Sequence, residues 1–118
     1  MTTNEGPTGV GALYAYIERV ERNNAGAPLH SRMYAAESAL YMAWDVLKEL
    51  RSRRRRARKA GYSTQHWDKL IPPAAVDVAR ARRFLDRVRV EAVGTDMESR
   101  CAHWTHFTTE QTYCPRRW

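Results

Sequence analysis

The chain of 118 residues is poor in the features that mark several large protein classes. It has only two cysteines, which excludes a dense disulfide framework. Its longest uninterrupted apolar run, from Ala39 to Trp44, is six residues long, far short of the roughly 20 that a transmembrane helix needs. The segment from Met1 to Gly11 lacks the basic and apolar regions of a secretory signal. We therefore expect a cytoplasmic protein without a membrane partner.

Sequence motifs of common enzymes are also missing. The chain has no glycine-rich phosphate loop, no G-x-S-x-G, no H-E-x-x-H and no close pair of carboxylates in an apolar setting. These absences predict a protein that is not an enzyme and that binds no cofactor.

What the sequence does contain is helical patterning. Apolar residues make up 43% of the chain and charged residues 28%, a composition typical of a globular domain, and the length suits a single core. No alternation long enough for a strand is present. We predict an all-α fold, a single small helical bundle of about four main helices over residues 8–118. A flexible tail at 1–7 precedes it, and residues from about 111 form a C-terminal tail.

Apolar spacing and the placement of glycine and proline predict where the helices lie. A first helix is expected over residues 8–23. The second begins near Pro28, meets no glycine before Gly61, and carries an inward stripe of Met33, Ala36, Leu40, Ala43, Leu47 and Leu50. A short helix opened by Ser63 or Thr64 is expected to end at Pro72 and Pro73. The next runs over 74–93, with Val78, Ala81, Leu85, Val88 and Ala92 inward, and the last follows a capping box at 95–98.

The net charge of +7 comes from one short segment. Residues 51–59, which we call the Arg run, hold seven basic and no acidic side chains, and the rest of the chain is neutral. At about 100° per residue, five of the seven fall within an arc of about 140°: Arg51, Arg54, Arg55, Arg58 and Lys59. This arc continues the leucine stripe, and burial of unpaired arginine is costly. Either the helix ends near Leu50 or it extends beyond the core.

Dense positive charge of this kind is suited to the backbone of a nucleic acid, which releases counterions when arginine and lysine bind it. The alternative is a solvated helix end that only aids solubility. A membrane surface would require an apolar face beside the charges, and the Arg run offers only Ala57. We expect binding with little sequence preference, because no recognition helix follows the run.

A second basic stripe lies on the helix expected over 74–93. Arg80, Arg83 and Arg87 share one face, and ion pairing with nearby acidic residues explains this stripe as well as a ligand does. If both stripes face the same way they form a groove for a phosphate backbone, but the sequence leaves their relative orientation open. Tyr62 and Trp67 are candidates for stacking on unpaired bases, and core packing explains Trp67 equally well.

Four residues near the C-terminus are of types that zinc accepts: Cys101, His103, His106 and Cys114. Cys101 and His103 would be about 200° apart on a helix, and the C-x-H-x₂-H-x₇-C spacing is not that of a structural zinc site. We therefore expect no metal. A small zinc-stabilised regulator stays open as an alternative.

Aromatic residues are more numerous than a small bundle easily buries. Tyr34 and Tyr41 share a side of the second helix away from the Leu40 stripe. This pattern is typical of a protein interface, or else of a further core layer.

Taken together, the Arg run, the stripe of Arg80, Arg83 and Arg87, and the surplus aromatics resemble the helical small subunits of class 1 CRISPR effector complexes. The resemblance implies a subunit that contacts nucleic-acid backbone, as RNA or single-stranded DNA, beside other protein subunits in a ribonucleoprotein assembly; self-association is left open. Small phage-encoded proteins that modulate host machinery have a similar profile. The competing hypothesis is a phage-type inhibitor or adaptor whose Arg run meets an acidic protein surface.

Overall fold

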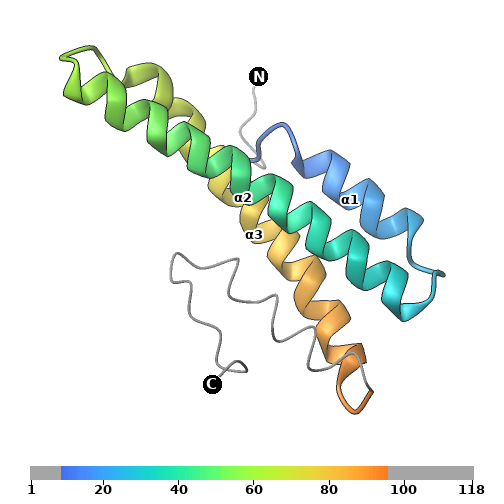
Figure 1. Cartoon of the computed structure of the whole chain (residues 1–118). Helices are drawn as coiled ribbons and strands as arrows, with labels where there is room; N and C mark the ends of the chain where they lie inside the picture. The colour runs from blue at the N-terminus through green and yellow to red at the C-terminus, as the bar shows by residue number, and fades with distance from the viewer. Residues whose placement is uncertain (1–8, 96–118) are drawn as a thin grey trace, which may run out of the picture.

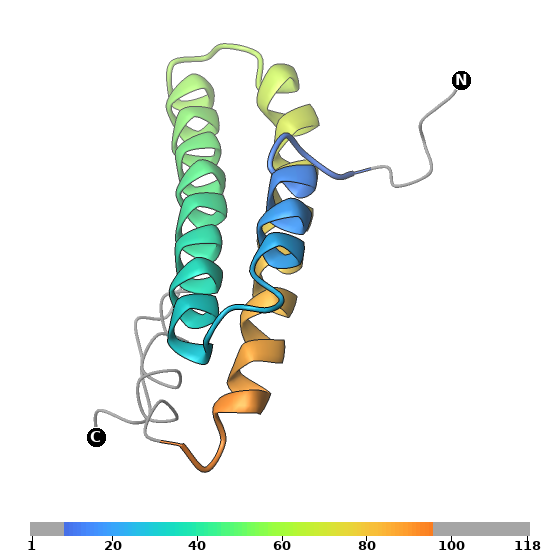
Figure 2. The ribbon, with the colours of Figure 1, turned by 90° about the vertical axis from the view of Figure 1, so that its right-hand side faces the viewer.

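A computed structural model describes residues 9–95 of the chain. These residues form three helices, α1 (Tyr14–Asn23), α2 (Leu29–Lys59) and α3 (Gln65–Ala92). The long helices α2 and α3 run side by side in opposite directions, and α1 packs against one side of this hairpin (Figures 1 and 2). No strand occurs in the described part, which confirms the all-α class.

The number of helices differs from the prediction. Residues 9–95 contain three helices, against about four main helices expected for the whole chain. The helix predicted after the capping box, the N-terminal tail at 1–7 and the tail from about 111 lie outside the described residues.

The predicted core stripes of the two long helices meet each other. On α2 the buried members are Met33, Ala36, Leu40, Ala43 and Leu47, and on α3 they are Ala81, Leu85, Val88 and Ala92. Ile17 of α1 and Phe84 of α3 complete the cluster. Small alanines in both stripes let the long helices approach closely, while the larger side chains supply most of the buried apolar area.

The first helix begins later than predicted, at Tyr14 rather than near residue 8. Gly9 has φ of 98°, a left-handed conformation that interrupts a helix. The chain then turns onto α3, where the Asp77 carboxylate accepts hydrogen bonds from the backbone N–H groups of Gly11 and Leu13, at 2.8 and 3.2 Å. Asp77 thus accepts hydrogen bonds from backbone N–H groups at the start of α1. No side chain at the start of α1 itself caps these groups.

The break predicted at Pro72 and Pro73 is wrong, because α3 is continuous from Gln65 through both prolines. Proline has a helical φ, and its cost inside a helix comes from a lost hydrogen bond and a clash with the preceding turn, about 3 kcal/mol. Contacts with α2 hold this turn of α3 in place: Ala74 is buried, and Asp68 pairs with Arg54 of α2. Of the two residues expected to open a helix here, Ser63 or Thr64, the structure has Thr64 directly before α3.

The turn between α2 and α3 depends on Gly61. Its φ of 84° lies in the left-handed region, and its N–H donates to the Arg58 carbonyl while that of Tyr62 donates to the Ala57 carbonyl. This pair of bonds is the Schellman motif that ends many helices. The motif ends α2 at Lys59, the last residue of the Arg run, and reverses the chain so that α3 runs back along α2.

Candidate nucleic-acid interface

The Arg run forms the exposed end of α2. Leu47 is the last fully buried residue of that helix, and the helix continues to Lys59. This end of the hairpin extends past α1 (Figures 1 and 2). Of the two alternatives drawn from the sequence, the structure has the one in which the helix extends beyond the core.

Three arginines of the run pair with acidic side chains. Arg54 continues the side of α2 on which Leu50 and Leu47 lie one and two turns earlier. Its Nε donates to Asp68 of α3 at 2.6 Å. Arg53 donates to Glu49 at 2.7 Å, and Arg56 lies 3.9 Å from the same carboxylate. Hydrogen bonds from Arg53 and Arg54 hold the pKa of Glu49 and of Asp68 below their ordinary values. These pairs neutralise part of the run.

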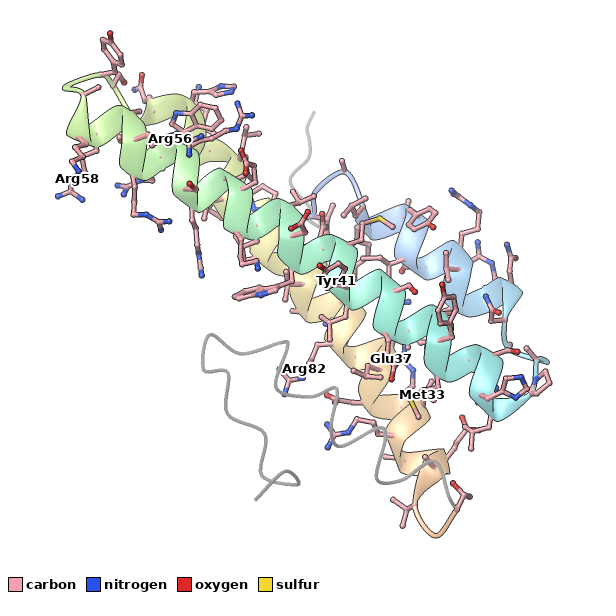
Figure 3. All side chains as sticks on the ribbon, viewed as in Figure 1. Met33, Glu37, Tyr41, Arg56, Arg58 and Arg82 are labelled. Atoms are coloured by element: carbon pink, nitrogen blue, oxygen red, sulfur yellow. The ribbon has the colours of Figure 1, made fainter. Side chains whose placement is uncertain are left out.

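Three other cations of the run face solvent along a different side of α2. Arg55, Arg58 and Lys59 are exposed, and none of them makes an ion pair within residues 9–95. Figure 3 shows Arg56 and Arg58 leaving the end of α2 on different sides. The run thus has two sides. Arg53 and Arg56 lie next to Glu49, and Arg55, Arg58 and Lys59 form the unpaired side.

Lys48 lies next to these exposed cations on α2 and was missed in the sequence. It is exposed, and it shares an arc of about 80° with three members of the Arg run. We call this set the basic stripe: Lys48, Arg51, Arg55 and Arg58. The alternating steps of three and four residues, which continue back to Trp44 and Tyr41, are the signal that would have identified it. At 1.5 Å per residue the stripe is about 15 Å long.

A groove lies between the basic stripe and the start of α3. It is open to solvent, has a volume of about 380 Å³, and is lined by Arg51, Arg54, Arg55, Asp68, Ile71 and Pro72. At its edge the guanidinium of Arg51 lies over the ring of Trp44, 5.7 Å from the centroid. Positive charge and apolar surface therefore meet in the same place.

The second stripe holds α1 in place. Arg80 is 8% exposed and donates to Glu21 at 2.7 Å, and Arg87 donates twice to the same carboxylate, at 2.6 and 2.7 Å. Arg83 is exposed and reaches the Tyr14 hydroxyl at 3.3 Å. None of these three arginines lines the groove between α2 and α3. The two stripes therefore do not form one groove.

Acid is expected to weaken the attachment of α1. Burial alone would raise the pKa of Glu21, but hydrogen bonds and charges from Arg87 and Arg80 outweigh it, so the pKa lies below its ordinary value of 4.5. The stabilisation is complete above that value and is lost as the pH falls through the lowered pKa of the folded state. Thermal melts between pH 7 and pH 3 should show a larger loss for the wild type than for Glu21→Gln. Equal losses would contradict this linkage.

Several aromatic side chains lie on the surface. Tyr62 is 73% exposed at the turn, and Trp67 is half-buried between His66, in an edge contact at 4.5 Å, and the guanidinium of Arg53 at 6.0 Å. Tyr34 and Tyr41 are 67% and 58% exposed. These two tyrosines therefore do not form a further core layer.

The predicted metal ligands Cys101, His103, His106 and Cys114 lie outside the described residues. Within residues 9–95 no group of three metal-ligating side chains occurs. Over the same range no helix is both long and apolar enough to cross a bilayer.

Comparison with known proteins finds no relative. The chain matches no protein-family model, no curated protein and no solved structure.

Proposed function

We propose that this protein is a non-enzymatic helical subunit that binds the backbone of RNA or single-stranded DNA within a larger ribonucleoprotein assembly. The observation that carries the proposal is the unpaired side of the Arg run: Arg55, Arg58 and Lys59 are exposed, and none forms an ion pair within the described residues. Like charges held so close repel one another, and phosphates spaced along a strand relieve that repulsion.

The shape of the surface supports a strand rather than a single anion. The basic stripe runs along the axis of α2 for about 15 Å, which is the length of several nucleotides. Arg80 and Arg87 are assigned to holding α1, so only Arg83 of the second stripe is left as a further contact to the ligand. The resemblance to CRISPR small subunits then rests mainly on the Arg run.

A role inside an assembly is supported by the exposed aromatic and aliphatic side chains on α2. Tyr34, Tyr41, Met42 and Val46 are all 38% or more exposed. Exposed tyrosine and methionine are enriched in protein interfaces. We assign this part of α2 to contacts with other subunits.

The test of backbone binding is a salt titration with unrelated single- and double-stranded oligonucleotides. Each phosphate neutralised contributes about 0.7 to 0.9 to the slope of log K against log salt. The variant Arg55→Gln/Arg58→Gln should therefore flatten the slope by about 1.5 units, with a similar loss for every sequence. Its fold should be unchanged by circular dichroism, since both side chains are exposed.

The matched control is Arg19→Gln/Arg22→Gln, which removes the same charge from exposed positions on α1. It should leave the slope close to that of the wild type. Equal slopes for wild type and the α2 variant, or no binding by the wild type at low salt, would reject the proposal and favour the competing acidic protein partner.

A further inference from the structure

The groove between α2 and α3 combines groups that a phosphate alone would not require. Arg51, Arg54 and Arg55 line it from α2, where Arg54 donates its Nε–H to Asp68, while Ile71 and Pro72 of α3 form an apolar wall. A site for simple phosphate would gain nothing from that wall. The volume of about 380 Å³ falls within the range of small-ligand sites.

Pro72 interrupts the backbone hydrogen bonding of α3 beside this groove. In a regular helix the N–H of residue 72 would donate to the carbonyl of Asp68, four residues earlier. Proline has no N–H, so that bond cannot form, and Asp68 and Pro72 both line the groove. The groove thus combines charged side chains and an apolar wall with a turn of α3 that lacks one backbone hydrogen bond.

These are the features that recognise one unpaired nucleobase and its phosphate. A base offers donors and acceptors on its edge and an apolar face, and both are accessible only when the base is out of a duplex. Arg55 links the two parts of the surface, because it lines the groove and also belongs to the basic stripe.

We infer that the groove lined by Arg51, Arg54, Arg55, Asp68, Ile71 and Pro72 receives a single unpaired base of a strand whose phosphates lie along the basic stripe. This inference rests on the nucleic-acid-binding function proposed above. The face of the base lies against Ile71 and Pro72, and its edge meets the Asp68 carbonyl. The protein thereby prefers single strands over duplexes while reading little sequence.

The test compares a single-stranded oligonucleotide with a sugar-phosphate strand of the same length that lacks bases, at one salt concentration. A base stacked on an aromatic side chain contributes roughly 1 to 3 kcal/mol in single-strand sites. Contact with the aliphatic wall of this groove should reach the lower part of that range, so the wild type should bind the strand with bases about five- to tenfold more tightly. Pro72→Ala restores the N–H, closes the Asp68 carbonyl and removes the ring. This variant should bind both strands with nearly the same affinity.

Pro73→Ala is the matched control. It makes the same chemical change one residue later in α3, at a position that does not line the groove, and it should keep the wild-type preference. Pro72→Ala should also raise the melting temperature, because a proline leaves a helix interior, so weaker binding cannot be ascribed to misfolding.

Three outcomes would overturn the inference. The wild type could bind both strands equally, which leaves backbone binding standing and removes the base site alone. Pro72→Ala could keep the preference, which places base contact elsewhere, with exposed Tyr62 as the next candidate. If the wild type binds neither strand at low salt, the proposed function fails together with the base site.

Discussion

Replacing Phe84 by alanine is expected to lower the free energy of unfolding by about 3 to 5 kcal/mol. Phe84 is 2% exposed and belongs to the buried cluster that also contains Ile17 of α1 and Leu40 of α2. Truncation removes the largest fully buried side chain of the described core. The surrounding alanines are too small to fill the space, so the cavity adds to the lost burial. Chemical denaturation followed by circular dichroism measures the change.

Val90→Ala on the same helix is the control, because Val90 is 73% exposed and its truncation should change stability by no more than about 0.5 kcal/mol. A loss below about 1 kcal/mol for Phe84→Ala would mean that α1 does not cover this part of α3.

Helix α2 and the part of α3 after Pro73 could be predicted because their folding rests on local patterns. Steps of three and four residues identify the buried side of α2, and Leu40 and Leu47 are both buried as predicted. Phe84 was not identified because it lies at the edge of the α3 stripe. Its burial is settled by α1, which reaches this position only through the tertiary fold.

The two wrong predictions, the break at Pro72 and Pro73 and the start of α1, also have their origin in the tertiary fold. A helix through Pro72 and Pro73 contradicts local preference, and packing against α2 maintains it. The start of α1 is set by Asp77, 66 residues from Gly11 along the chain. A sequence pattern with a period of a few residues carries no information about a partner so distant.

Only part of the candidate site could be predicted from the sequence, for similar reasons. The Arg run is visible in the sequence, and the cost of burying arginine left two alternatives for it, a helix end near Leu50 or an extension beyond the core. The structure has the extension. Its division into paired and unpaired sides depends on Glu49, which is local, and on Asp68, which belongs to another helix. The groove could not be predicted, because its walls come from two helices and one of them was expected to end at Pro72.

Removing the acidic partner of Arg80 is expected to release α1 from the hairpin. In Glu21→Ala, Arg80 keeps a 3.9 Å approach to Glu18 and a position over the Tyr14 ring, 5.9 Å from its centroid, but its 9% exposed side chain loses its close acidic partner. Breaking a buried ion pair from one side costs about 3 to 5 kcal/mol. Because Glu21 itself is 22% exposed, we expect about 2 to 4 kcal/mol, as measured by chemical denaturation.

The route of that loss can be followed directly. Undocking α1 exposes Arg80 to water, so the variant is expected to lose hydrogen-exchange protection in α1 before α2 and α3 are affected. Glu18→Ala is the control, since Glu18 is 47% exposed and only approaches Arg80, and it should cost less than about 1 kcal/mol.

Adding Arg80→Met to Glu21→Ala should recover part of the stability, because an apolar side chain replaces the unpaired charge. The basic stripe lies toward the end of α2 that extends past α1, so backbone binding should survive in all three variants. Intact protection of α1 in Glu21→Ala, or a double variant less stable than the single one, would show that the Arg80–Glu21 pair does not attach α1 to the hairpin.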